Sequence, residues 1–381
     1  MAQSIGLTSA LNEVFDHQNQ MTAELQALTR RLTHAGYAEY LTSFDPYRFR
    51  PEQFLRYKAL ASPQLRVLID FFLLNRSVHT DQLTGLLSTS WQVLVHLGLA
   101  ETLPQNQVQL PTYVLHQHYG HWIFIDRPTA DPNVYFGDDS QGLFHRITAR
   151  PGDRVLDLCS GSGIQAFQSA TYAAQVDAVE INPVARRVLR INSLMNGLGD
   201  RVRTFGGSLF EQVESGQRYD LVTANPPLVP FPNSVKYPFV GHGGIDGFAV
   251  TRKIISGLNI HLTELGRAQI IALTFSDGNA LMIHDELDKL AQNLNLDFVI
   301  TVINHVPMDA SSAFFDGLAA SAVQVETHTF DEIKQILRTE LDERGLKYLT
   351  PYYLFVRRGS GKVYYQNMAR YNREGLWFVL T

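Results

Sequence analysis

The chain has 381 residues, of which 45% are hydrophobic and 18% are charged, so about two to three domains are expected and extensive disorder is excluded. Lys and Arg number 32 against 37 Asp and Glu, a formal net charge of -5, which lacks the basic balance typical of nucleic-acid-binding proteins. A single cysteine excludes a disulfide framework and a thiolate-rich metal site, and the lack of a long apolar run or secretory signal predicts a cytoplasmic protein with no membrane partner.

Residues 1–128 are predicted to form a mainly helical accessory domain. Leucines within residues 25–32 recur at helical spacing. Ser62-Pro63, Thr80 and Ser90 are start signals for three further helices. Strand patterns follow at residues 108–110, 113–116 and 121–125.

Three short helices followed by a β-ribbon are the element order of a winged helix. Residues 1–150 contain 11 basic and 13 acidic side chains, whereas a DNA-reading domain is normally more basic. We therefore expect this domain to recruit a substrate or protein partner. His116, His118 and His121 form a loose cluster, which we interpret as part of a β-ribbon because a metal site needs three or four convergent ligands.

The Pro-rich stretch 126–132 is the predicted linker to a second domain at 129–381. Beyond it, strand patterns alternate with helical ones. This alternation predicts a doubly wound α/β fold with a mostly parallel sheet. The expected strands lie at 154–158, 175–180, 220–224, 268–275, 298–304 and 352–357.

A small-residue turn follows the first of these strands and precedes a helix expected to begin near Ile164. Small residues let the backbone pass close to a ligand, and a helix N-terminus offers free N–H donors. Gly161, Gly163 and Ala166 also fit the dinucleotide fingerprint, which alone is weak evidence. The turn therefore predicts a cofactor site without naming the cofactor.

Asp157 narrows the choice of cofactor, whereas Glu180 does not, because both candidate cofactors carry a ribose. Asp157 lies four residues before Gly161, where a carboxylate would repel a pyrophosphate but attract the ammonium group of S-adenosylmethionine by about 1–4 kcal/mol. Glu180 ends the next strand and is spaced to accept hydrogen bonds from ribose hydroxyls. The alternative is that Asp157 caps a helix and Glu180 is a surface charge.

The segment Asp220–Leu228 contains Asn225-Pro226-Pro227 at the end of a predicted strand. It resembles the N-P-P-aromatic motif of class I S-adenosylmethionine-dependent N-methyltransferases, and most closely the methyltransferase small domain group. That group includes release-factor glutamine methyltransferases and ribosomal-RNA guanine N-methyltransferases. Residues 207–210, and 243–247 with Arg252, add to the resemblance, which covers about residues 134–275.

The resemblance implies a seven-stranded Rossmann-like methyltransferase sheet. It also implies two groups of site residues, one that binds the methyl acceptor and one that binds the cofactor. The side-chain oxygen of Asn225 and the backbone carbonyl of Pro226 would accept the N–H groups of a planar acceptor nitrogen, and two prolines stiffen that turn. No strong base and no metal are needed, because the proton can leave after the methyl group arrives. The cofactor side comprises Tyr135, Phe136, Asp157, Cys159, Gly161, Gly163, Ile164, Gln165, Glu180, Ile181, Ser208, Leu209 and Asn225.

Two positions depart from the family pattern. Leu228 stands where the family usually has Tyr or Phe, so the acceptor would meet an apolar wall without a π-face. Ser208 stands where Asp often contacts the adenine amino group. Cys159 occupies a position where many such loops have glycine; with no His or basic neighbour it is interpreted as a small turn residue and not as a catalytic thiol.

Three segments are candidates for further roles around the site. Asp138 and Asp139 could form a general acid/base pair, but a solvated turn is the favoured interpretation. An insertion at about 306–348, with a helix expected at 330–344, is too long for a plain connection. Together with residues 229–242 it is predicted to form a substrate rim or lid.

The sequence thus predicts an S-adenosylmethionine-dependent N-methyltransferase that leaves S-adenosylhomocysteine as product. The acceptor would be a side-chain amide of a protein or peptide, or an amide in a natural product. One alternative is methylation of the exocyclic amine of an RNA guanine, which the near-neutral charge of the N-terminal region disfavours. Another is a winged-helix regulator with a degenerate methyltransferase domain, which the intact motif residues disfavour.

Overall fold

The computed structural model describes residues 19–45, 51–129, 131–309, 311–372 and 375–379. Part of the predicted amphipathic region (residues 1–18) and one linker position, Ala130, lie outside them. The chain folds into two compact units, one of Met1–Arg127 with Arg187–Asp200 and one of Pro128–Arg186 with Arg201–Thr381. The second segment of the first unit was not predicted.

The first unit begins with helices. Residues 19–34 are helical and bury the three leucines of the predicted apolar face. Ser62 caps α4 by accepting a hydrogen bond from the Leu65 N–H, as its position before Pro63 predicts. Thr80 is the first residue of α5 and not its cap; the Nδ1 atom of His79 accepts the Asp81 N–H instead. The helices are α2 (Tyr37–Thr42), α3 (Pro51–Tyr57), η1 (Lys58–Leu60), α4 (Pro63–Phe72), α5 (Thr80–Leu87) and α6 (Gln92–His96).

The strands of the first unit form two small sheets. One has the antiparallel order β1-β3-β2 and the other is the hairpin β4-β5. The sequence pattern indicated the last three strands but not β1 or β2. Assignment of these elements to a winged helix stays a prediction. The bounds are β1 (Val78–His79), β2 (Glu101–Leu103), β3 (Gln107–Gln109), β4 (Tyr113–His118) and β5 (His121–Asp126).

Two asparagines explain why residues 187–200 belong with the first unit. The side-chain oxygen of Asn192 accepts the Phe124 N–H at 2.8 Å, and that of Asn196 accepts the Trp122 N–H at 2.8 Å. Their side-chain amides donate in turn to the carbonyls of the same two residues. Residues four apart lie on one helix face, so the last turn of α9 (Pro183–Met195) and the residue directly after it pair with alternate residues of β5.

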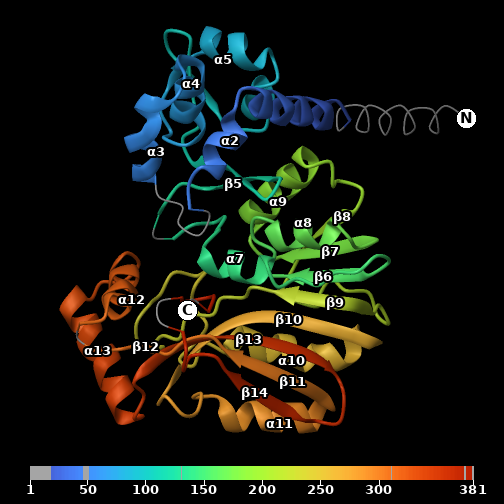
Figure 1. Cartoon of the computed structure of the whole chain (residues 1–381), viewed down its shortest axis with the longest axis vertical. Helices are drawn as coiled ribbons and strands as arrows, with labels where there is room; N and C mark the ends of the chain where they lie inside the picture. Colours follow the sequence, from blue (N-terminus) through green and yellow to red (C-terminus); the bar gives the residue numbers. More distant parts are fainter. Residues whose placement is uncertain (1–18, 46–50, 130, 310, 373–374, 380–381) are drawn as a thin grey trace, which may run out of the picture. The chain divides into compact units, whose positions relative to one another are not determined.

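The second unit is built on a mostly parallel sheet with the order β14-β11-β13-β10-β9-β6-β7-β8 (Figure 1). The five strands β8, β7, β6, β9 and β10 are parallel, and β13 runs antiparallel between β10 and β11. The described sheet extends the predicted seven strands to nine by adding β14 and β12. The bounds are β6 (Arg154–Leu158), β7 (Gln175–Glu180), β8 (Val202–Gly206), β9 (Tyr219–Ala224), β10 (Leu262–Ser276), β11 (Leu296–Val302), β12 (Val306–Pro307), β13 (Tyr348–Arg358) and β14 (Val363–Asn367).

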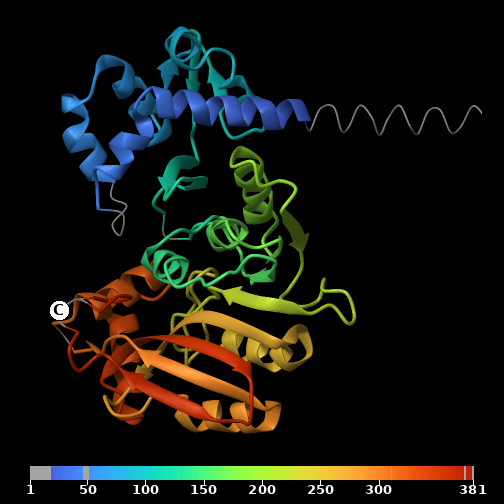
Figure 2. The same ribbon diagram turned by 45° about the vertical axis from the view of Figure 1, so that its right-hand side comes forward.

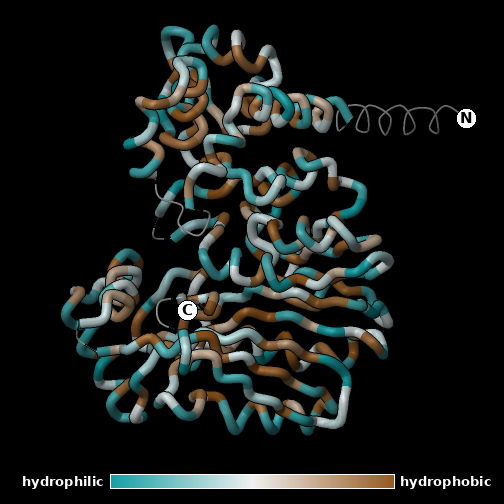
Figure 3. The backbone as a smooth tube through the Cα atoms, viewed as in Figure 1, coloured by the Kyte–Doolittle hydropathy of each residue, from teal (hydrophilic) through white to brown (hydrophobic). Residues whose placement is uncertain are grey.

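Helices cover both faces of this sheet. Alternate residues of β10 point to opposite faces, and the side chains on each face pack against a different set of helices. Ile270 and Ala272 pack in one apolar cluster with residues of α10 and α11, whereas Ile271 and Leu273 pack in another with α7, α12 and α13. The strands are correspondingly apolar in Figure 3. The helices of this unit, besides the first turn of α9, are α7 (Asp138–Phe144), α8 (Ile164–Ala170), α10 (Ala249–His261), α11 (His284–Leu294), α12 (Ala313–Val323) and α13 (Phe330–Glu343).

The insertion at 306–348 contains β12, α12 and α13, and α13 matches the helix predicted at 330–344. Figure 2 shows α12 and α13 gathered at one end of the sheet. Within the described residues no helix combines the length and apolar character needed to cross a bilayer.

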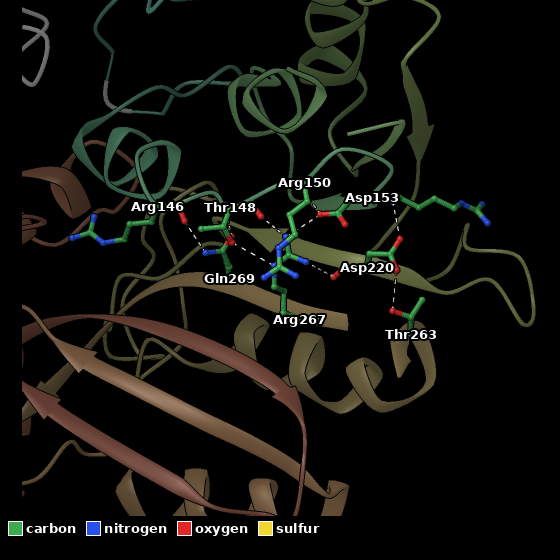
Figure 4. Close-up of polar contacts among 9 residues, drawn as sticks. Arg146, Thr148, Arg150, Asp153, Asp220, Thr263, Arg267 and Gln269 are labelled. Atoms are coloured by element: carbon green, nitrogen blue, oxygen red, sulfur yellow. Dashed lines mark hydrogen bonds and ion pairs between the residues drawn. The ribbon is translucent and has the colours of Figure 1, made fainter. Parts of the chain in front are cut away.

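Buried polar contacts fasten the segment before β6 to the amino ends of the strands (Figure 4). Arg267 is 5% exposed and donates to Asp153 Oδ2 at 2.9 Å and to the Asp220 carbonyl at 3.2 Å. Gln269 Oε1 accepts the Thr148 N–H at 2.9 Å. These bonds hold the entry to β6, the strand that carries the glycine turn, in one position.

Candidate active site

A cavity of about 450 Å³ lies at the carboxyl ends of β6, β7 and β9. Strand order reverses at β6, since β7 and β8 lie on one side and β9 and β10 on the other. The loops that leave adjacent strands diverge at such a switch point and form a crevice for a ligand. The predicted cofactor turn and the Asn-Pro-Pro motif both reach this one cavity.

The turn after β6 depends on residues in the left-handed backbone region. The φ angles of Cys159, Gly161 and Gly163 are +57°, +51° and +90°, and Gly163 precedes the first residue of α8. Glycine adopts this conformation without strain, whereas Cys159 does not. Burial raises the pKa of the Cys159 thiol, with Glu180 and Asp157 adding to the effect. The thiol therefore stays protonated at neutral pH, in line with its interpretation as a small turn residue.

Glu180 holds the same turn from the neighbouring strand. Its Oε2 atom accepts the Gly161 N–H at 2.9 Å and its Oε1 atom accepts the Asn182 N–H at 2.7 Å. The side chain is buried and lines the cavity, so it is not a surface charge. Each carboxylate oxygen can accept a second hydrogen bond, which leaves capacity for a pair of ligand hydroxyls.

Asp157 lies beneath the turn and is 1% exposed. Its Oδ1 atom accepts the Thr223 hydroxyl at 2.7 Å, and its Oδ2 atom has no hydrogen-bond partner among the described residues. Burial raises its pKa to about 7, against the effect of the Thr223 bond. Gly163, and not Asp157, stands at the N-cap of α8. A buried carboxylate with one unpaired oxygen suits a cationic ligand group nearby.

Asn225 forms the wall of the cavity at the end of β9. Its Nδ2 atom donates to Asp139 Oδ2 at 2.9 Å and to the Ser140 hydroxyl at 3.3 Å. Its Oδ1 atom is buried and has no hydrogen-bond partner among the described residues. Pro227 also lines the cavity. The motif thus brings Asn225, whose buried oxygen has no partner among the described residues, to the wall of the cavity.

Asp139 corrects the expectation of a solvated turn at residues 138–139. It is 8% exposed and lies in the first turn of α7. The Tyr135 hydroxyl donates to its Oδ1 atom at 2.8 Å, while Asn225 takes its Oδ2 atom. Burial raises the pKa of Asp139, and the bonds from Asn225 and Tyr135 oppose that rise. A carboxylate with two such donors is a built part of the site.

The structure brings most of the sequence-predicted residues to one cavity. Tyr135, Cys159, Gly161, Gln165, Glu180, Ile181, Ser208, Leu209, Asn225 and Pro227 line it. Those outside the lining are Phe136, Asp157, Gly163, Ile164, Pro226 and Leu228. Asp157, Gly163 and Ile164 nonetheless belong to the strand, turn and helix that shape its floor.

Leu228 does not form the expected apolar wall. It is buried in the cluster with Phe231, Ile271 and Phe315, because the chain after Pro227 turns that side chain into the core. The aromatic side chains that do line the cavity from this loop are Tyr237 and Phe239. Sequence reasoning named residues 229–242 as a rim but did not single out these two.

The rim loop is fastened to the insertion. The Lys236 N–H donates to Glu326 Oε2 at 2.8 Å, in the turn between α12 and α13. A second, more open cavity of about 550 Å³ is lined by both of these residues together with Phe239 and His242. Phe239 and His242 line the first cavity as well. The two cavities therefore meet at this loop.

The histidine cluster of the first unit behaves as a structural feature. His116 and His118 are buried on β4, and burial lowers the pKa of His116 to about 4. No group of three His, Cys, Asp or Glu side chains within the described ranges is arranged to hold a metal ion.

Comparisons with known proteins show what the chain is similar to. The family model described as methyltransferase small domain matches residues 135–295. A ribosomal protein uL3 glutamine methyltransferase from Bradyrhizobium diazoefficiens is 37% identical over 163 residues, 38% of this chain and 50% of the relative. A release factor glutamine methyltransferase from Clostridium acetobutylicum is 39% identical over 115 residues, 29% of this chain and 38% of the relative.

This chain therefore spans half or less of the length of these relatives. Among solved structures, Trm5b from Pyrococcus abyssi is 15% identical, with a TM-score of 0.40 over 68% of this chain and 62% of that one. The fold is defined by the sheet topology above and not by this distant likeness. The segment at residues 135–295 belongs to the methyltransferase small domain family of class I S-adenosylmethionine-dependent methyltransferases.

Proposed function

We propose that the protein is an S-adenosylmethionine-dependent N-methyltransferase acting on a planar nitrogen, with a side-chain amide of a protein or peptide as acceptor. The observation that carries this proposal is the state of Asn225. Its amide nitrogen donates to Asp139 and Ser140, while its buried oxygen has no hydrogen-bond partner in the described part of the chain. An acceptor N–H would satisfy that oxygen.

The floor and one side of the cavity suit the cofactor. The unpaired Oδ2 atom of Asp157 supplies negative charge for an ammonium group. The spare acceptor capacity of Glu180 suits ribose hydroxyls, and Ile181 and Leu209 add apolar surface for a flat base. S-Adenosylmethionine, when bound, would supply a methyl group attached to a sulfonium sulfur, and that sulfur is a good leaving group.

The protein's part in the transfer is to position the nitrogen. The new N–C bond forms as the S–C bond breaks, and the nitrogen then releases a proton. An amide lone pair is delocalised, so an oxygen that accepts the N–H favours charge building up on nitrogen. Asn225 Oδ1 would act in this way, together with the Pro226 carbonyl, and the two prolines keep the turn stiff. No metal and no strong base enter this scheme.

The choice of a protein acceptor draws on the relatives, whose names give glutamine in ribosomal protein uL3 and in a release factor as the methylated groups. The charge of -5 disfavours RNA, because phosphate binding needs a basic track. An amide natural product is the remaining small-molecule acceptor. The presence of all three motif residues Asp157, Glu180 and Asn225 disfavours the alternative of a regulator with a degenerate methyltransferase domain. A cytoplasmic location fits acceptors of the translation machinery.

Transfer of a labelled methyl group into a cell lysate tests the function. We expect label in macromolecules that protease releases and nuclease does not, and acid hydrolysis should release it as methylamine from an N-methyl amide. Asn225→Ala should abolish incorporation, whereas Asn279→Ala, at an exposed turn, should not. Label released by nuclease would replace the protein acceptor by RNA, and no incorporation into any fraction would contradict the enzyme.

A further inference from the structure

The pairing of Asn225 with Asp139 decides which end of the Asn225 amide is available to a ligand. An asparagine side chain fits its site in two orientations that exchange oxygen and nitrogen, and its neighbours select one. An ionised carboxylate only accepts hydrogen bonds. Asp139 Oδ2, 2.9 Å from the Asn225 nitrogen, therefore places Nδ2 on its own side and Oδ1 on the opposite side of the amide.

Asp139 is itself held on several sides. The Tyr135 hydroxyl donates to its other oxygen at 2.8 Å. Ser140, the next residue, accepts from Asn225 through its hydroxyl and from Gln165 Nε2 at 3.0 Å through its carbonyl. The second of these bonds ties α7 to α8. The carboxylate consequently has little freedom to move away from Asn225.

The Asp139 carboxylate is not placed to contact a substrate directly. Both of its oxygens have donors from the protein, and it is absent from the residues that line the cavity, whereas its partners Tyr135 and Asn225 are present. Any influence on the reacting nitrogen has to pass through the amide of Asn225.

We propose that Asp139 is a positioning residue for the methyl transfer: it locks the Asn225 amide so that Oδ1 faces the acceptor nitrogen. This inference rests on the proposed function. It also restricts the acceptor to a nitrogen that carries a hydrogen, because the locked oxygen can only accept. In the reverse orientation Nδ2 would meet that N–H donor to donor, and the nitrogen would lose its alignment with the methyl carbon.

Exchanging the two side chains gives the sharpest test. In Asp139→Asn two amides face each other and the orientation of Asn225 is no longer fixed; in Asn225→Asp two buried carboxylates repel. In the double variant Asp139→Asn/Asn225→Asp, the amide at 139 donates to one carboxylate oxygen at 225 and leaves the other as an acceptor. Asp138→Asn is the matched control, since it makes the same change at the adjacent exposed position.

The readouts are the initial rate of labelled methyl transfer into lysate at saturating S-adenosylmethionine, the cofactor affinity by calorimetry, and the melting temperature. We expect each single variant to lose about 10- to 100-fold in rate, with cofactor affinity within about threefold of the wild type. The double exchange should recover at least about tenfold over Asn225→Asp. The pair Asp138→Asn/Asn225→Asp should recover nothing.

A wild-type rate in Asp139→Asn, or a double exchange no faster than Asn225→Asp, would overturn the positioning role. Failure of the proposed function would look different, because the wild type would then transfer no label. Should Asp139→Asn fail to fold, Tyr135→Phe loosens Asp139 without altering its charge. That variant should slow transfer with unchanged cofactor affinity, and an unchanged rate in it would count against the proposal.

Discussion

The two ends of the central sheet in the second unit treat buried polar groups in opposite ways. At the amino ends, Arg267 finds partners in Asp153 and in the Asp220 carbonyl. At the carboxyl ends, Asp157 and Asn225 each keep one buried oxygen that has no hydrogen-bond partner within the described ranges. Leaving such an atom unpaired costs about 1–3 kcal/mol, and native proteins keep few of them.

This contrast distinguishes residues that stabilise the fold from residues that we expect to bind ligands. The hydrogen-bonded network at the amino ends fixes the position of the segment that enters β6. The turns that follow the parallel strands then meet at one crevice. We expect the unsatisfied oxygens at the carboxyl ends to bind the cofactor and the acceptor. Mutations at the first end should act on stability, and mutations at the second on binding and rate.

The largest effect is expected from Arg267→Ala. It leaves Asp153 buried beside no cation, and breaking a buried pair costs about 3–5 kcal/mol. Urea unfolding followed by circular dichroism should show a loss of this size in the free energy of unfolding. Arg154→Ala, at an exposed position nearby, should change it by less than about 1 kcal/mol. Equal losses in the two variants would remove the distinction between the ends.

Asp157→Asn should raise the stability of the protein at pH 8 and lower its affinity for S-adenosylmethionine. The pKa of Asp157 is raised to about 7, above its ordinary value near 3.8, chiefly by burial. A raised carboxyl pKa means that its contribution to stability is present at low pH and is lost as pH rises through about 7. At pH 8 without cofactor, the variant should therefore be more stable than the wild type by at least about 1 kcal/mol.

That gain in Asp157→Asn should shrink towards pH 5, where the wild-type carboxyl is protonated. Affinity for S-adenosylmethionine should instead fall about 10- to 100-fold at pH 8, a loss of about 1.4–2.8 kcal/mol. Melting curves and calorimetry across this pH range measure both. A variant less stable than the wild type at pH 8 would show that the buried charge is not a liability.

Leu228→Phe restores the aromatic residue usual at this motif position in the family. Because Leu228 packs in the core with Phe231 and Phe315, the larger ring should overpack that cluster and cost about 1–3 kcal/mol. The melting temperature should fall and the transfer rate should not rise. Leu265→Phe, at a position 90% exposed, serves as the control. A faster enzyme would mean that residue 228 does contact the acceptor.

The smallest effect is expected from Phe239→Ala. This side chain is 63% exposed where the two cavities meet, so it suits the apolar side of an acceptor chain. Removing it should raise the lysate concentration needed for half-maximal transfer about 5- to 10-fold, as expected for one partly buried aromatic. Cofactor affinity should not change. Tyr371→Ala, at another exposed aromatic, should change neither quantity.

Local motifs predicted several residues that the structure places at the cavity. The turn after β6 and Glu180 are readable because each lies at the end of a strand with a strong pattern, and parallel strands bring their carboxyl ends to one edge. Asp139 escaped because a pair of acids after glycine is typical of a solvated turn, and only the approach of Asn225 and Tyr135, fixed by tertiary packing, turns one of them into a site residue.

Long-range packing also explains the other differences. Leu228 follows the motif directly in sequence, but the fold directs it into the core, whereas Tyr237 and Phe239 reach the cavity from nine or more residues further on. The edge strand β14 pairs with β11 across more than sixty intervening residues, and no local pattern encodes such a partner. Residues 187–200 join the first unit through two asparagine side chains whose acceptors lie on β5.

Calorimetric titration of the protein with S-adenosylmethionine at pH 8 measures whether the carboxyl-end crevice binds the cofactor as proposed. We expect binding at one site per chain, weakened by Asp157→Asn and retained in Arg154→Ala. Absence of binding by the wild-type protein would contradict this expectation.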